Sequence, residues 1–289
     1  MVRKWQILCS MILALTFAFP ESAFSAVRKH SASTKKAAHT TKKKSHKSSK
    51  KVAKKTRAKT KVATRRWRTK VATSNMMWSA PMNTTPLSPA LSARMKANFQ
   101  RGQAGRYTPQ DMVRARVFSN APLLGGIKPR TAIVKNLIIH STETAKVADA
   151  KTVVHSWNSG GLRHPGTQYL VDRDGKIYQT VDPKYATIHV NERRTIGGIT
   201  NDNSIGIEIV RTGKQKYTQV QLASLVQLVD YIQERFPIAK IYGHGQIQPS
   251  NRTDPVAFNW NLFSKNLAHI NAASTQTAYR EDSREDNQG

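Results

Sequence analysis

The chain of 289 residues has almost no cysteine, since Cys9 is the only one. A single thiol cannot form an intramolecular disulfide, and it cannot build a thiolate metal site. Any metal ion must therefore be held by His, Asp or Glu. Long hydrophobic runs are also lacking, because the apolar run Ile7–Phe19 is shorter than the roughly 20 residues that span a bilayer.

The first 25 residues have the parts of a signal peptide. Arg3 and Lys4 precede the apolar run 7–19, and Ala23-Phe24-Ser25 offers small residues at the positions that a signal peptidase reads. A lipoprotein signal would need Cys directly after the apolar run, but Cys9 lies near its beginning. We therefore expect export to the periplasm or cell envelope, or secretion. An uncleaved membrane anchor is the alternative.

Acidic residues are absent from residues 27–71, which hold nineteen Lys or Arg and little that could be buried. This composition predicts that 26–71 is disordered. Its charge indicates adhesion to a polyanion, such as an anionic envelope polymer, a membrane surface or nucleic acid. The alternative is a solvated tether. Trp67 is the only aromatic residue in the segment, so a base-stacking platform is missing and nucleic acid is the weakest of the three partners.

The charge is ordinary in residues 131–270, which hold sixteen basic and eleven acidic side chains. We expect this segment to be the single catalytic domain, because about 140 residues suffice for one core. Residues 72–130 are interpreted as a linker with short helices near 90–100 and 109–117, packed outside the domain. Residues 271–289 are polar and without periodicity, so we expect a disordered C-terminal tail.

Strand and helix patterns alternate along the domain. Strands are predicted at 133–140, 168–172, 176–181, 204–210 and 238–242, and helices at 144–157, from Thr218 to Pro237, and at 259–270. The second and third strands form a hairpin around Gly175, and Gln221 stands at the capping-box position after Thr218. This order predicts an α/β fold with a mixed central β-sheet flanked by helices.

Three polar residues stand at the ends of these elements. His140 ends the strand Leu137-Ile138-Ile139-His140, His244 follows the strand at 238–242, and Asp254 lies ten residues further on. Two imidazoles and a carboxylate suit zinc and leave a fourth tetrahedral position for water, which favours hydrolysis. A histidine at a strand end is, however, more often a hydrogen-bonded structural residue. We interpret His155 and His164 in that structural way.

Glu208 lies in the middle of the apolar strand 204–210. A buried carboxylate is costly unless it has a partner or a function. Beside a zinc-bound water it could accept a proton and pass it to a leaving amine. Pairing with a nearby Arg is the alternative.

Four blocks of sequence in this order resemble the zinc-dependent N-acetylmuramoyl-L-alanine amidases, which share a fold with peptidoglycan-recognition proteins. They are Leu137–Thr142, Gln168–Gln179, Asn201–Glu208, and Gly243–Pro249 with Arg252–Pro255. The resemblance covers about half of the chain and none of residues 1–130.

The resemblance implies one zinc ion held by His140, His244 and Asp254, with Glu208 as the general base. Arg252 stands where the family usually has an oxyanion-stabilising Lys, and Gln168 replaces a family His. His189 matches a family His that lines the substrate cleft. The implied reaction hydrolyses the amide between N-acetylmuramic acid and L-alanine in peptidoglycan or muropeptides, and we expect a monomer. The alternative is a non-catalytic peptidoglycan-binding module, because the same fold also serves recognition.

Overall fold

A computed structural model describes the backbone of residues 75–285 and the side chains of residues 75–272. The expected signal peptide at 1–25 and basic segment at 26–71 lie outside the described residues. Within the described part, none of the helices combines the length and hydropathy needed to cross a membrane.

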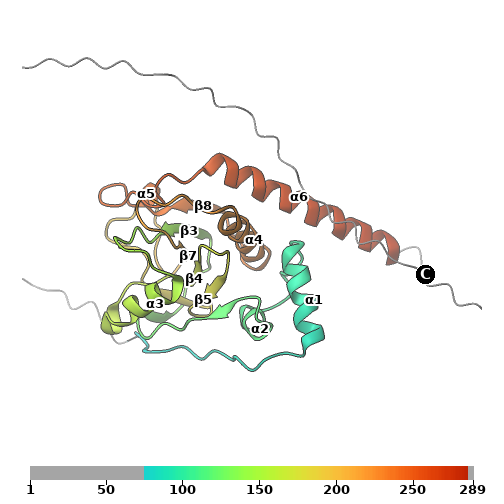
Figure 1. The fold of residues 1–289 in the computed structure, drawn as a ribbon, viewed down its shortest axis with the longest axis horizontal. Coiled ribbons are helices and arrows are strands. Elements are labelled where there is room, and N and C mark those ends of the chain that lie inside the picture. Colours follow the sequence, from blue (N-terminus) through green and yellow to red (C-terminus); the bar gives the residue numbers. More distant parts are fainter. Residues whose placement is uncertain (1–74, 286–289) are drawn as a thin grey trace, which may run out of the picture. The chain divides into compact units, whose positions relative to one another are not determined.

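The main sheet is mixed, as the sequence predicts (Figure 1). Its strands lie in the order β1 (Ser119–Asn120), β5 (Ile177–Gln179), β4 (Tyr169–Val171), β7 (Ser204–Ile209), β3 (Asn136–Ser141) and β8 (Lys240–Gly243). The pairs β4–β7, β7–β3 and β3–β8 are parallel, whereas β4 and β5 form the expected antiparallel hairpin. A separate antiparallel pair, β2 (Ile127–Pro129) and β6 (Tyr185–Thr187), was not predicted.

Six helices accompany the strands in the described residues. They are α1 (Pro89–Gln100), α2 (Pro109–Arg114), α3 (Ala150–Asn158), α4 (Gln219–Arg235), α5 (His244–Ile247) and α6 (Trp260–Glu285), with a short 3-10 turn at Gly161–Arg163. In Figure 1, α4 and α6 lie side by side, and residues of the two helices are in contact. The capping box of α4 is confirmed, because Thr218 Oγ1 accepts from the Gln221 amide at 3.1 Å and Gln221 Oε1 accepts from the Thr218 amide at 3.4 Å.

Two helix boundaries were wrong. The helix expected from Thr144 begins at Ala150, because Asp149 caps it by accepting a hydrogen bond from the Thr152 amide at 2.8 Å. The last helix was expected to end at Ile270, but α6 continues to Glu285 and so includes most of the expected C-terminal tail. Residues 286–289 lie outside the described residues.

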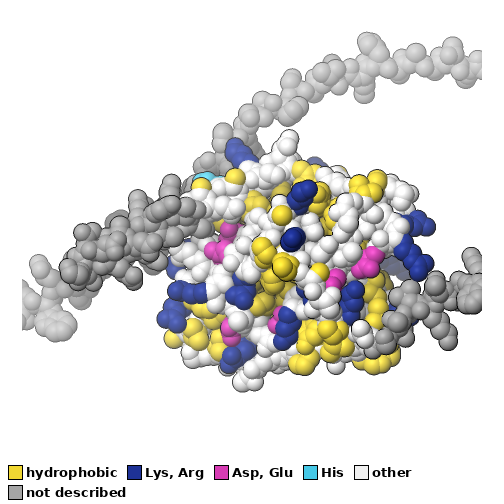
Figure 2. Space-filling model, turned by 180° about the vertical axis from the view of Figure 1, so that it is seen from behind, with side chains coloured by type: hydrophobic (Ala, Val, Ile, Leu, Met, Phe, Trp, Pro, Cys, Tyr) yellow, Lys and Arg dark blue, Asp and Glu magenta, His cyan; other side chains and the backbone are white. Residues whose placement is uncertain are grey.

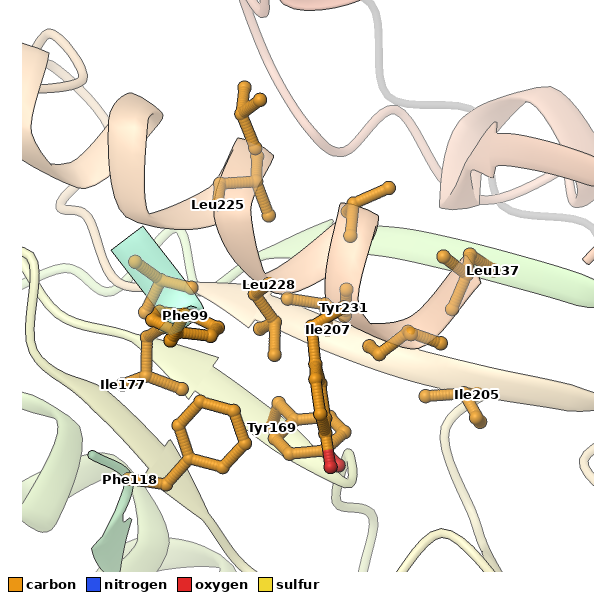
Figure 3. Close-up of a cluster of buried hydrophobic side chains, with 14 of the residues drawn as sticks. Phe99, Phe118, Leu137, Tyr169, Ile177, Ile205, Ile207, Leu225, Leu228 and Tyr231 are labelled. Carbon is orange, nitrogen blue, oxygen red and sulfur yellow. The ribbon is translucent and has the colours of Figure 1, made fainter. Parts of the chain in front are cut away.

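The prediction that residues 72–130 form a linker outside the domain is wrong for the described residues 75–130, because several of them belong to the main core. The short helices α1 and α2 are confirmed, but Met95, Phe99 and Met112 on them are buried in the same cluster as the sheet. Phe118 is 1% exposed, and its ring centroid lies 5.4 Å from Phe99, 5.7 Å from Tyr169 and 5.5 Å from Tyr231 (Figure 3). The domain therefore begins well before residue 131.

The strands alternate strictly between the two faces of the sheet. Leu137 and Ile139 of β3 and three isoleucines of β7 pack into the main core together with α4 and α6. The residues between them, among them Ile138, His140 and Glu208, therefore face the opposite side. That opposite side carries α3 at one end, through Val153 and Val154, and the polar site described below.

Replacing Phe118 with Ala tests whether residues 75–130 are part of the core. The Phe118→Ala variant of the full chain should lose about 3–5 kcal/mol of unfolding free energy, because a buried ring shared by three elements is removed. Leu124→Ala, at a side chain that is 50% exposed, is the matched control and should change the free energy by less than about 0.5 kcal/mol. Chemical denaturation measures both. Equal, small losses in the two variants would mean that 75–130 is a linker after all.

Candidate active site

The site lies where β3, β7 and β8 end. His140 is the second-last residue of β3 and pairs in register with Glu208 of β7. In a parallel pair the side chains of register partners point to the same face, so both project away from the main core. His140 is 4% exposed and Glu208 is 8% exposed. The structure thus brings together His140 and Glu208, each the second-last residue of its strand.

His244 and Asp254 are brought to the same point by two glycines. His244 directly follows β8, between Gly243 and Gly245. A Cβ on Gly243 would lie 2.8 Å from Pro255 Cδ, and a Cβ on Gly245 would lie 3.0 Å from Thr253 Cα. Because neither residue has a side chain, the loop that carries Asp254 packs directly on this turn, and the Gly245 amide donates to the Asp254 carbonyl at 2.7 Å.

One atom from each of the three residues converges on one point. His140 Nδ1 lies 3.0 Å from His244 Nδ1, and Asp254 Oδ2 lies 3.2 Å from His244 Nδ1 and 3.6 Å from His140 Nδ1. Among the described residues, these three form the group of His, Cys, Asp or Glu that could hold a metal ion. The structure thus brings together the three residues that the sequence analysis proposed as metal ligands.

Hydrogen bonds behind the ring of His244 determine which nitrogen is free. Gln248 is fully buried, and its amide nitrogen donates to Asn251 Oδ1 at 3.1 Å. Its Oε1 therefore faces His244 Nε2, at 3.2 Å, as an acceptor. His244 then carries its proton on Nε2, which leaves a lone pair on Nδ1 toward the site. Such a partner behind the ring is the usual arrangement for a metal-binding histidine.

Burial fits the protonation states that metal ligands need. Burial lowers the pKa of His140 to about 4, even though Asp254 opposes the shift, so the ring is neutral near pH 7. Burial would raise the pKa of Asp254, but its contacts with His140 and His244 outweigh burial and lower it. Two imidazoles and one carboxylate are a ligand set that zinc takes in hydrolytic enzymes. The donor set of this chain therefore fits a divalent metal ion.

The pKa of Glu208 is raised well above its usual value, first by burial and then by the charge of Asp254, while Arg252 opposes the rise. A divalent cation beside it would favour the ionised carboxylate. Glu143, the other carboxylate nearby, is already engaged, because Ser141 Oγ donates to it at 2.6 Å and Arg211 Nε lies 3.2 Å away. Glu208 is thus the carboxylate available to act as a base.

Arg211 connects the strand ends with the loop that carries Asp254. Its guanidinium is 4% exposed and donates to the carbonyls of Val256 and Gly213 in addition to its ion pair with Glu143. Tyr217 also donates to the Val256 carbonyl, at 3.0 Å. Arg211, Gln248 and Ser204 were missed by sequence reasoning. Only Gln248 carried a signal, because it follows the proposed ligand His244 by four residues, at the end of α5.

A cavity of about 660 Å³ adjoins the site and is bordered by His189 and Arg252. Three further cations line it, namely Lys128, Arg163 and Arg193, with Glu192 as the only acid. Arg252 also lines a second cavity, of about 290 Å³, together with Asp254. On the face of the molecule seen in Figure 2, by contrast, acidic and basic side chains are interspersed. The cavity beside the site is therefore suited to an anionic ligand.

Gln168 and His189 take positions that the sequence did not specify. Gln168 is fully buried, accepts from the Gly206 amide at 2.8 Å and donates to the Tyr185 carbonyl at 3.2 Å. It joins β7 to β6 and is a structural residue. His189 borders the cavity but is only 7% exposed, and its Nδ1 lies 3.1 Å from His140 Nε2. Burial lowers its pKa well below the usual value, so this ring is neutral.

Comparisons with known proteins find similarity to amidases in the part of the chain that carries the site. Residues 130–257 match the family model described as N-acetylmuramoyl-L-alanine amidase. The 1,6-anhydro-N-acetylmuramyl-L-alanine amidase AmpD of Enterobacter cloacae is 36% identical over 98 residues, which are 32% of this chain and 52% of that protein. The Escherichia coli AmpD is 37% identical over 98 residues, covering 32% of this chain and 54% of that protein.

The chain spans about half the length of the curated relatives it matches. A crystal structure of a selenomethionine AmpD derivative aligns with a TM-score of 0.44 and 25% identity, over 51% of this chain and 93% of that one. The match of residues 130–257 contains all three converging residues as well as Glu208 and Arg252. This part of the chain is therefore similar to the N-acetylmuramoyl-L-alanine amidase family.

Proposed function

We propose that this chain is a zinc amidase that hydrolyses the amide between N-acetylmuramic acid and L-alanine in peptidoglycan or its soluble fragments. The observation that carries the proposal is the convergence of His140, His244 and Asp254 beside the buried, unengaged carboxylate of Glu208. A zinc ion at such a site supplies an activated water and polarises the carbonyl that is attacked.

Residues of the chain would supply proton transfer, stabilisation of the oxyanion and binding of the substrate. Glu208 accepts the proton of the attacking water and returns it to the alanine nitrogen as the amide breaks. Arg252 stabilises the negative oxygen that develops on the carbonyl, since it borders both the cavity beside His189 and the cavity lined by Asp254. The cationic cavity holds the carboxylates of the stem peptide.

A non-catalytic peptidoglycan-binding module is the rival function. A module that only binds its ligand needs neither a complete set of metal ligands nor a base beside them. This chain keeps all three ligands and Glu208, so we favour the enzyme.

The metal site is tested on the purified full chain by elemental analysis. One zinc ion per chain is expected, and His140→Ala, His244→Ala and Asp254→Ala should each lose most of it, because two ligands hold zinc poorly. His155→Ala is the matched control, since His155 is an exposed histidine on α3, and it should keep the metal. Wild-type protein without bound zinc, or ligand variants that retain it fully, would contradict the assignment.

The activity is tested with purified muropeptides, following the release of stem peptide by mass spectrometry. Wild-type protein should cleave after zinc is supplied and stop when a chelator removes it. Glu208→Gln keeps the shape of the side chain but cannot take a proton, so it should lower kcat by about 10²–10⁴-fold while zinc content and muropeptide binding stay unchanged. Binding without cleavage by zinc-loaded wild-type protein would favour the rival module, and an active Glu208→Gln variant would remove Glu208 as the base.

We also propose that the protein is exported and that residues 27–71 attach it to an anionic envelope polymer. The support is in the sequence: a signal-peptide pattern at 1–25, and nineteen cations without an acid at 27–71. Nucleic acid is a poor candidate for this partner, because the segment has a single aromatic residue and an exported protein does not meet the chromosome.

Salt dependence tests the role of the basic segment. Sedimentation with purified sacculi should be strong for the full chain at low salt and should fall steeply toward 0.15 M, because the Debye length shrinks from about 30 Å at 0.01 M to about 8 Å. Deleting residues 27–71 should weaken sedimentation but leave the turnover of small muropeptides unchanged. If both forms sediment equally and without regard to salt, the segment is a passive spacer.

A further inference from the structure

His189 lies between a proposed metal ligand and a buried serine. Its Nδ1 is 3.1 Å from His140 Nε2, and its Nε2 is 3.1 Å from Ser204 Oγ. Ser204 is fully buried, and its hydroxyl donates in turn to the carbonyl oxygen of Thr200. Four polar groups thus form one continuous chain that starts behind the ring of His140 and ends at a backbone carbonyl.

The carbonyl at the end sets the direction of every hydrogen bond in this chain. A carbonyl oxygen can only accept a hydrogen bond, so the single hydroxyl proton of Ser204 is donated to the Thr200 carbonyl. Ser204 Oγ must then accept from His189, which places the proton of the neutral His189 ring on Nε2. His189 Nδ1 is left as an acceptor, so His140 donates from Nε2. The remaining nitrogen of His140, Nδ1, keeps its lone pair, and it is the atom that faces His244 and Asp254.

The backbone of β7 leaves room for this arrangement. A Cβ on Gly206 would lie 2.9 Å from His189 Cγ and 3.0 Å from its Nδ1. The ring of His189 therefore packs directly on the strand, at an angle of 85° to the ring of His140. The Asn201 side chain fixes the backbone on the other side by accepting from the amides of His189 and Val190, each at 2.9 Å.

We propose that His189 and Ser204 are positioning residues that hold His140 in the tautomer able to bind metal through Nδ1. The inference deepens the proposed function and rests on its metal site. Under this proposal, His189 supports the proposed metal ligand His140 and does not contact the substrate. Because Gln248 fixes the ring of His244 independently, loss of the relay should affect one of the two histidine ligands and spare the other.

Four variants of the full chain separate positioning from packing. Ser204→Ala removes the hydroxyl that polarises the relay. His189→Leu removes the acceptor behind His140, whereas His189→Asn restores one, because an Asn Oδ1 occupies nearly the place of an imidazole Nδ1. Thr187→Val is the matched control for a buried hydroxyl outside the relay: Thr187 is 1% exposed and its Oγ1 has no hydrogen-bond partner.

The first readout is zinc affinity, measured by competition with a chromophoric chelator. His189→Leu should bind zinc about 10–100-fold more weakly than wild type, which is the usual effect of losing the partner behind a metal-binding histidine. His189→Asn should recover most of this loss, Ser204→Ala should show a smaller loss, and Thr187→Val should bind like wild type. Wild-type affinity in His189→Leu, or equal losses in His189→Leu and His189→Asn, would overturn the proposal.

The second readout is the tautomer itself, observed by NMR of histidine ring nitrogens in metal-free protein. Wild type should show the proton of His140 on Nε2, and Ser204→Ala should show a second tautomer for His140 while His244 is unchanged. An unchanged His140 in Ser204→Ala would overturn the relay. This spectrum does not need bound zinc, so it tests the relay even if wild-type protein takes up no metal. Absence of metal binding would contradict the proposed function, whereas the tautomer of His140 is tested separately by the spectrum.

Discussion

The parallel pairing of β3 with β7 sets His140 beside Glu208, and the whole site is arranged around that pair. Side chains alternate between faces along a strand, so a shift of one residue would place one member of the pair in the apolar core under α4. The register is held by the isoleucines and Leu137 on the core face, which are fully buried. The packing of apolar side chains on one face thus determines the position of the polar groups on the other.

Around this pair, each proposed ligand has its own support. The loop of Asp254 is held by Arg211 and by the two glycines that flank His244, the ring of His244 by Gln248, and the ring of His140 by His189. These supports are neutral hydrogen bonds or backbone contacts, apart from Arg211, whose charged guanidinium donates to the Val256 carbonyl and pairs with Glu143. Among these supports, Glu143 adds negative charge near Glu208, and Arg211 compensates it.

Much of the site could be predicted from sequence because its residues stand at strand ends with a clear apolar pattern before them. His140, His244 and Glu208 are examples, and Thr218 with Gln221 shows the same for a helix start. The core contribution of residues 75–130 could not be predicted, because Phe99 and Phe118 are buried by contacts with Tyr169 and Tyr231, far away in the sequence. The role of Ser204 depends on a backbone carbonyl, and no side-chain pattern records which carbonyl lies nearby.

The three converging residues are unevenly spaced along the chain, and this has a thermodynamic consequence. His244 and Asp254 are ten residues apart, whereas His140 and His244 are 104 residues apart. An unfolded chain can therefore offer a metal ion two ligands from a short loop, but three only when the sheet has formed. A metal bound by all three in the folded state would raise the free energy of unfolding by about 4 kcal/mol at a concentration 1,000 times its Kd. The availability of metal would then also govern the stability of the fold.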